Sequence, residues 1–180
     1  MSYNPEKHNR RSIRLPKYDY GKPGVYFFTI CTNKRVCLFG DVVQGQMTLN
    51  TYGRIIAEEW HRTERIRDHV ALDAFVVMQN HVHGVIAITH RSERRRGVSQ
   101  HASTRGFKSP SQTLGAIVRG FKGVATRRIN RRRGTPGTPV WQRNYYEHIV
   151  RGRRDLERIR RYIHTNPARW HRDRNHPAQT

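Results

Sequence analysis

The sequence predicts an α+β fold in which an antiparallel sheet carries its helices on one side. Two features predict it. Apolar segments of strand length alternate with amphipathic segments of helical period, and a short turn joins neighbouring strand segments. In chain order the segments read strand, hairpin, helix, strand, strand, helix, strand and helix. With 180 residues the chain can bury one proper core, so a single domain over residues 1–180 is expected.

The first strand is expected over residues 24–32, where Val25 to Ile30 are apolar on both faces and indicate a central position in the sheet. A hairpin over residues 37–49 would turn at Gln44-Gly45. Residues 70–78 then predict another buried strand, which turns at Gln79-Asn80 into a strand over residues 81–89. The segment 140–150 predicts a short strand or an extended segment.

Three helices are expected. Asn50 or Thr51 can cap the first, whose apolar positions are Tyr52, Ile55, Ile56 and Trp60. The second runs from Ser111 to about Asn130 with the buried stripe Leu114, Ile117, Val118, Phe121, Ala125 and Ile129. The last spans roughly Arg154 to Thr165, buries Leu156, Ile159 and Ile163, and ends before Pro167.

Three polar segments complete the predicted domain: a basic arm over residues 1–22, a mobile basic loop over 92–110 and a polar tail over 171–180. The chain has 35 Lys and Arg against 13 Asp and Glu, a formal charge of +22 and a pI near 11.4. Such an excess repels itself and favours a polyanionic partner.

Other classes of protein fit the composition poorly. No apolar run is long enough to span a membrane, and Met1 to Arg14 lack the apolar core of a signal peptide. Cys31 and Cys37 do not make a disulfide framework. We therefore expect a cytoplasmic protein, in the bacterial cytosol or nucleoid, that acts on nucleic acid and not on membranes.

The positive charge is concentrated in one quarter of the chain. Between Arg91 and Arg133 there are 13 Lys or Arg and a single acid, Glu93. A charge run is usually a solvated face, but the size and one-sidedness of this run favour contact with a phosphate backbone. The helical candidates for that contact lie off the buried stripe and are Arg119, Lys122, Arg127 and Arg131. The arm adds Arg10, Arg11 and Arg14.

His81-Val82-His83 is a candidate metal site. On a strand the two imidazoles project from one face with their bases roughly 6–7 Å apart, so their ring nitrogens can converge on one ion. Alternation puts Val85 on the same face and Val82 on the other. The alternative is two ordinary histidines near a strand start, because a chain with eleven histidines forms such a doublet easily. Ring nitrogens by themselves suit zinc equally well.

Tyr162 and Asn166 lie four residues apart, on one face of the last helix. A tyrosine hydroxyl can attack a phosphodiester and hold the cut strand covalently, and an amide oxygen can complete a His-His-Asn ligand set. The alternative is packing, with Asn166 as a C-cap that lies just outside the regular helix, because a residue that precedes a proline avoids the α region. Tyr145 and Tyr146 compete for the nucleophilic role from an aromatic stretch that can also be a half-buried strand or stack on bases.

At these residues the chain closely resembles the REP-associated tyrosine transposases of the HUH single-tyrosine superfamily. The resemblance extends from about Asn9 to Trp170. It rests on Tyr26-Phe27-Phe28-Thr29-Ile30-Cys31-Thr32, Met78-Gln79-Asn80-His81-Val82-His83-Gly84, the Trp141 to His148 block and Tyr162-Ile163-His164-Thr165-Asn166-Pro167. Gln79 departs from the proline that often precedes the histidine pair in this family.

The resemblance implies an RRM-like, ferredoxin-like palm with the histidines on a central strand and a helix that brings the tyrosine alongside. It implies Mg²⁺ or Mn²⁺ held by His81, His83 and Asn166, with Tyr162 as the nucleophile. It also implies cleavage and rejoining of single-stranded or hairpin DNA through a 5′-phosphotyrosine, with the arm and basic helix recognising the repeat. The protein would act as a monomer or a homodimer. The alternatives are a repeat-binding protein without chemistry and a hydrolytic nuclease in which metal-bound water attacks.

Overall fold

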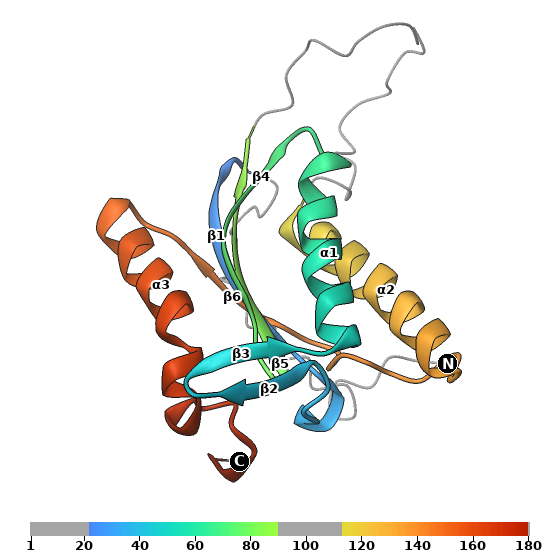
Figure 1. Cartoon of the computed structure of the whole chain (residues 1–180). Coiled ribbons are helices and arrows are strands. Elements are labelled where there is room, and N and C mark those ends of the chain that lie inside the picture. Colours follow the sequence, from blue (N-terminus) through green and yellow to red (C-terminus); the bar gives the residue numbers. More distant parts are fainter. Residues whose placement is uncertain (1–21, 90–112, 180) are drawn as a thin grey trace, which may run out of the picture.

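The computed structural model describes residues 22–89 and 113–179. Its centre is a four-stranded antiparallel sheet in the order β4-β5-β1-β6 (Figure 1). The strands are β1 (Gly24–Cys31), β4 (Val70–Val77), β5 (His81–Ile88) and β6 (Tyr146–Ile149). A separate hairpin pairs β2 (Gly40–Val43) with β3 (Gln46–Leu49). The three α-helices are α1 (Thr51–Arg65), α2 (Leu114–Arg133) and α3 (Arg153–Thr165). Two predicted segments lie outside the described residues. They are the loop 92–110 and the arm with Arg10, Arg11 and Arg14, of which only Lys22 is described.

The predicted α+β class is confirmed, but the helices do not all lie on one side of the sheet. Helices α1 and α2 cover one face, and α3 lies against the other (Figure 1). Alternation along β1 explains the division. Tyr26 and Phe28 join the cluster beneath α1 and α2, whereas Phe27 joins Ile159 and Ile163 of α3. Because β1 is apolar on both faces, it needs a cover on each side.

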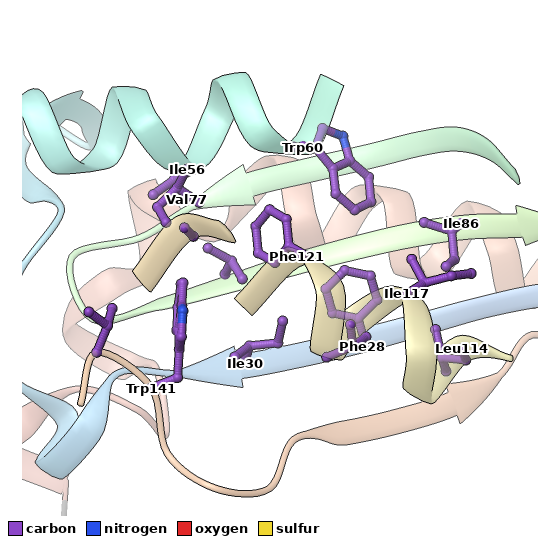
Figure 2. Close-up of a cluster of buried hydrophobic side chains, with 14 of the residues drawn as sticks. Phe28, Ile30, Ile56, Trp60, Val77, Ile86, Leu114, Ile117, Phe121 and Trp141 are labelled. Atoms are coloured by element: carbon purple, nitrogen blue, oxygen red, sulfur yellow. The ribbon is translucent and has the colours of Figure 1, made fainter. Parts of the chain in front are cut away.

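The larger core lies between the sheet and the pair α1 and α2. Figure 2 shows Phe28, Ile30 and Ile86 of the sheet meeting Trp60 of α1 and Phe121 of α2. The predicted stripe of α2 is confirmed, because all six of its members are buried: Leu114, Ile117, Val118, Phe121, Ala125 and Ile129. The sheet face that bears the histidines therefore does not hold the main hydrophobic core.

Local signals place the helix starts and the hairpin. Asn50 Oδ1 accepts hydrogen bonds from the backbone N–H groups of Tyr52 and Gly53 at 2.9 and 3.0 Å, which confirms the predicted cap of α1. Helix α2 starts at Leu114 and not at Ser111, because the Thr113 side chain caps it. At the hairpin, Gln44 and Gly45 have φ of 50° and 76°, the left-handed pair that a tight two-residue turn requires.

One strand expectation was wrong, and another, a short strand or extended segment over 140–150, is confirmed. The segment 70–78 was expected to be a buried strand, but β4 pairs only with β5 at the sheet edge, and its residues 72–76 are half-buried. The segment 140–150 forms the short strand β6 only at its end, after an isolated bridge between Thr32 and Trp141. That bridge brings the chain from the end of α2 back to the edge of β1.

Within residues 22–89 and 113–179, no helix has both the length and the apolar content needed to cross a membrane.

Candidate active site

The two histidines of the doublet begin the central strand β5 and face away from the main core. Both side chains are fully buried, and their Nε2 atoms lie 3.0 Å apart. The partner strand β1 places Cys31 opposite His81 and Thr29 opposite His83. Alternation therefore brings the imidazoles together as predicted, and Val82 enters the opposite cluster beneath α1 and α2.

Neighbouring groups hold both imidazole rings in position. Asn80 donates from Nδ2 to the carbonyls of Arg35 and Asn175, so its Oδ1 accepts from His81 Nδ1 at 2.8 Å. The proton of His81 consequently lies on Nδ1, and the lone pair of Nε2 points into the site. On the other ring, His83 Nδ1 lies 2.8 Å from the Thr29 hydroxyl. This pattern, in which the outer nitrogen is hydrogen-bonded, is typical of histidines that bind a metal through Nε2.

Burial keeps both imidazoles neutral. It lowers the pKa of His81 to about 4, against a smaller opposing effect of the Asp173 carboxylate. It also lowers the pKa of His83 well below its ordinary value, and the charge of a protonated His81 would lower it further. Near neutral pH both rings are thus in the form that binds a metal ion.

Asp173 is the site residue that the sequence reasoning missed. The carboxylate is buried, with Oδ2 4.0 Å from His81 Nε2. Together His81, His83 and Asp173 form a cluster whose ligand atoms all lie within 4.8 Å of one another. Two imidazole nitrogens and a carboxylate oxygen are a donor set that fits a divalent transition-metal ion such as Mn²⁺.

The segment after α3 carries Asp173 into the site. The short helix η4 (Pro167–Arg172) turns the chain back, and its buried Trp170 lies with its ring centroid 5.8 Å from that of His81. Asp173 Oδ1 then accepts from the N–H of Asn175 at 2.7 Å. Further anchors are the bonds from Arg35 to the Arg174 carbonyl and from Asn80 to the Asn175 carbonyl, both 2.8 Å. One signal could have pointed to Asp173, because it is the only acid after Glu157.

Tyr162 lies directly beside the histidines. Its hydroxyl oxygen is 3.2 Å from His83 Nε2 and 3.5 Å from Asp173 Oδ2, to which it donates. The ring is 40% exposed, so packing alone does not account for its position. Burial of the hydroxyl, followed by the negative charge of Asp173, raises the pKa of Tyr162 to about 12. The phenol is therefore protonated near neutral pH.

Helix α3 is fixed to the sheet at two levels. Ile159 and Ile163 pack on Phe27 and Val85, directly beside the histidine pair. On the outer side, Arg160 forms a two-pronged ion pair with Asp73 of β4, at 2.8 Å through Nε and 2.5 Å through Nη2. The alternation of side chains along β1 and β5 thus places two things on one face of the sheet: the apolar residues on which α3 packs and the site that Tyr162 faces.

Asn166 lies one residue beyond α3. The expectation that it would lie just outside the regular helix is confirmed, although its φ and ψ of −59° and −45° are still in the α region. Pro167 follows as the first residue of the helix η4, a position where a proline is well accommodated. Asn166 Nδ2 donates to Asp173 Oδ2 at 2.7 Å, and its Oδ1 is buried without a hydrogen-bond partner. An unpartnered buried amide oxygen is an available metal ligand.

The other tyrosines lie differently. Tyr145 packs against the main core cluster beneath α1 and α2. Tyr146 is opposite Thr29 in the β1–β6 register, and its ring is in edge contact with Phe27 at a centroid distance of 6.1 Å. Tyr146 is therefore on the same face of the sheet as His81 and His83, next to Thr29, which contacts His83.

The basic residues of α2 do not lie at the site. Arg119, Arg127 and Arg131 are exposed on a helix that covers the opposite face of the sheet. Lys122 differs from them, because its Nζ donates to the carbonyls of Gln142 and Arg143 at 2.5 and 3.3 Å. Burial lowers the pKa of Lys122. This lysine holds the segment before β6 and is a poor candidate for phosphate contact.

The fold and the site define an α+β protein in which a His-His-Asp cluster that could hold a metal ion lies beside a tyrosine hydroxyl. No model of a known protein family matches the chain. An uncharacterized protein of Haemophilus influenzae is 40% identical over 173 residues, which are 95% of each chain. The chain belongs to the same family as that protein.

Among solved structures, the chain is similar to a REP-associated tyrosine transposase bound to a REP hairpin. The TM-score is 0.52 at 21% identity, with 87% of this chain and 74% of the other covered. At that identity the likeness establishes a shared fold.

Proposed function

We propose that this chain is a metal-dependent DNA strand transferase of the REP-associated tyrosine transposase type. It would cut single-stranded DNA next to a hairpin-forming repeat and rejoin it through a covalent 5′-phosphotyrosine on Tyr162. The observation that carries this proposal is the distance of 3.2 Å between the Tyr162 hydroxyl and His83 Nε2. A potential nucleophile lies beside two neutral imidazoles that can bind a divalent ion.

In this proposal His81 and His83 bind Mg²⁺ or Mn²⁺ through Nε2, and Asn166 supplies Oδ1 as the third ligand. The unpartnered state of that oxygen supports the assignment. Asp173 orients the amide by accepting from Nδ2, and its Oδ2 is close enough to His81 to bind the ion as well. When bound, the ion would draw charge off the scissile phosphate and stabilise the leaving oxygen.

The chain's own groups carry the transfer. The Tyr162 oxygen attacks phosphorus, and the bond from phosphorus to the 3′ oxygen breaks. The phenolic proton passes by way of Asp173 to the departing oxygen, which leaves as a free 3′-OH. Asp173 accepts the phenolic proton, because Tyr162 already donates to its Oδ2. Rejoining is the reverse, in which a 3′-OH attacks the phosphotyrosine and the phenol takes back its proton.

Positive charge supports a nucleic-acid partner. The solved structure of the same fold is bound to a REP hairpin, and this chain carries a formal charge of +22. We assign backbone contact to Arg119, Arg127 and Arg131 on α2, together with Arg10, Arg11 and Arg14 of the arm. Such contacts supply affinity without reading the sequence.

The test uses a 3′-labelled DNA hairpin with single-stranded flanks, incubated with the protein and Mn²⁺ and then run on a denaturing gel. We expect a protein–DNA adduct with the wild type and none with Tyr162→Phe, which should still bind the DNA. Tyr145→Phe and Tyr146→Phe are matched controls that should keep the adduct. An adduct that survives in Tyr162→Phe and disappears in either control would overturn the choice of nucleophile.

Two other outcomes distinguish the rival functions. Cleavage without an adduct at any time would indicate a hydrolytic nuclease in which water attacks. Binding without cleavage under any divalent metal would indicate a repeat-binding protein.

A further inference from the structure

A cavity beside the candidate active site has Tyr162 in its wall, whereas His81 and His83 do not line it. It has a volume of about 380 Å³, within the range of roughly 300 to 1,000 Å³ that is common for ligand pockets. Its walls come from four elements: Phe27 of β1, Tyr146 and His148 of β6, Arg158 and Tyr162 of α3, and Arg174 of the C-terminal segment.

Exposed aromatic surface is concentrated in this cavity. Among the described residues, five large hydrophobic side chains are exposed, and only two of them, Tyr146 and Tyr162, are aromatic. Both line the cavity. Tyr146 of β6 is 37% exposed, although Phe27 of the neighbouring strand β1 is in edge contact with its ring. Exposed rings in a basic cavity are the arrangement on which single-stranded bases stack.

Cationic groups border the same rings. The Arg174 guanidinium carbon lies 5.2 Å from the centroid of the Tyr146 ring. A planar base can extend this stack, because guanidinium groups and aromatic rings both stack on bases. Arg158 Nη2 donates to Asp155 Oδ1 at 2.6 Å, and its side chain is still 72% exposed, so other donors remain for a phosphate.

Asp155 organises the basic wall. Its Oδ2 lies 2.8 Å from His148 Nε2 and accepts from the backbone N–H of Arg151 at 3.0 Å. The carboxylate thereby fixes the His148 ring and the Arg158 guanidinium relative to each other. The described lining of the cavity itself contains no acid.

We propose that this cavity holds one unpaired nucleobase of the strand that Tyr162 attacks, stacked on Tyr146, with Arg158 and Arg174 beside its phosphate. The inference rests on the proposed function and adds a substrate subsite to it. Because Tyr162 forms part of the wall, the bound base belongs to a nucleotide adjacent to the attacked phosphate. The cavity would therefore set the position of that phosphate relative to the Tyr162 hydroxyl.

The experiment uses hairpin oligonucleotides with 2-aminopurine at each unpaired position in turn, bound to a Tyr162→Phe protein so that no bond is cut. Stacking on a ring quenches 2-aminopurine fluorescence. We expect strong quenching at one position, lost in the added Tyr146→Ala and Tyr146→Leu variants and kept in Tyr146→Phe. Affinity measured by anisotropy should fall roughly tenfold for Tyr146→Ala. Ile66→Ala, which removes an exposed apolar side chain from the end of α1, is the control and should change neither signal.

A Tyr146→Ala protein with unchanged quenching, affinity and melting temperature would overturn the subsite. DNA binding with no quenching at any position would overturn it too, while leaving the proposed chemistry intact. Conversely, quenching that depends on Tyr146 without an adduct in the wild-type protein would support the subsite and count against strand transfer. A protein that binds no DNA would overturn both.

Discussion

Asn166 donates a hydrogen bond from Nδ2 to Asp173 Oδ2 over 2.7 Å, which ties the end of α3 to the segment that closes the site. The bond also decides the orientation of the amide. In the flipped orientation an amide oxygen would face a carboxylate oxygen, so Oδ1 must be the atom that points elsewhere and stays unpartnered. Asn166 thus presents Oδ1 as a possible ligand atom because Asp173 holds its Nδ2.

This relationship predicts that Asp173→Ala weakens Mn²⁺ binding even if Asp173 is not itself a ligand. We expect a loss of about 10- to 100-fold in affinity by titration calorimetry, the range for removal of a group that orients a ligand. His61→Ala, an exposed histidine on α1, should leave the affinity unchanged. Equal affinities for Asp173→Ala and the wild type would mean that Asp173 neither binds the metal nor orients one of its ligands.

The lowered histidine pKa values predict how the stability of the metal-free protein depends on pH. The unfolded chain protonates these histidines below an ordinary pKa of 6.5, whereas folded His81 does so only near 4. The unfolded state therefore binds more protons in this window, and the free energy of unfolding decreases as pH falls through it. Urea denaturation from pH 7 to 4 should show this decrease, and it should be smaller in His81→Asn than in His61→Asn.

Protons and a metal compete for the same nitrogens, which gives a separate prediction. The rise in melting temperature caused by Mn²⁺ should stay nearly constant while the folded imidazoles are neutral and should fade as pH falls through about 4, where folded His81 takes up a proton. Thermal melts with and without Mn²⁺ across this range would measure it. A metal effect that is unchanged at a pH well below 4 would place the ion away from the histidines.

Gly84 follows the histidine doublet on β5 and faces the main core, and its substitution should destabilise the fold. A Cβ at this position would lie 2.7 Å from Phe28 Cζ and 2.9 Å from Trp60 Cη2. These rings are buried in the core and have little room to move, so we expect Gly84→Ala to lower the free energy of unfolding by about 1–3 kcal/mol. Gly123→Ala on α2 is the control. There the nearest atom is 3.6 Å away, and the helix should gain about 0.5–1 kcal/mol.

The exposed arginines of α2 should affect DNA affinity and its dependence on salt. Replacing Arg127 and Arg131 with Gln should weaken hairpin binding and reduce the slope of log K against log salt by about two if each arginine contacts one phosphate. The control removes the same charge from α1 through Arg62→Gln and Arg65→Gln. Identical slopes for the two double variants would mean that net charge, and not the α2 surface, drives binding.

The sequence predicted local features well, because each depends on residues near one another in the chain. Asn50 as a cap, the stripe of α2 and the shared face of His81 and His83 follow from spacing and alternation. The placement of α3 could not be predicted this way. Its stripe resembles that of any amphipathic helix, and a strand that is apolar on both faces accepts a helix on either side.

Asp173 shows a second limit of the sequence. Its role depends on a turn of the chain after Pro167 and on hydrogen bonds to Asn166 and Asn175, which no periodic pattern encodes. The resemblance to a known family identified His81, His83, Tyr162 and Asn166, and the fold then brought these residues close together. The carboxylate that contacts three of them could be recognised only in three dimensions.

The two faces of β1 have different roles, and this limits where the family can accept insertions and deletions. Tyr26, Phe28 and Ile30 fill the main core, whereas Phe27 and Thr29 serve the opposite face. Inserting or deleting a single codon within β1 would exchange the two sets, sending Thr29 into the core and a core ring into the site. Over evolutionary time the strand can accept substitutions position by position, but insertions and deletions are confined to the connections between strands and helices.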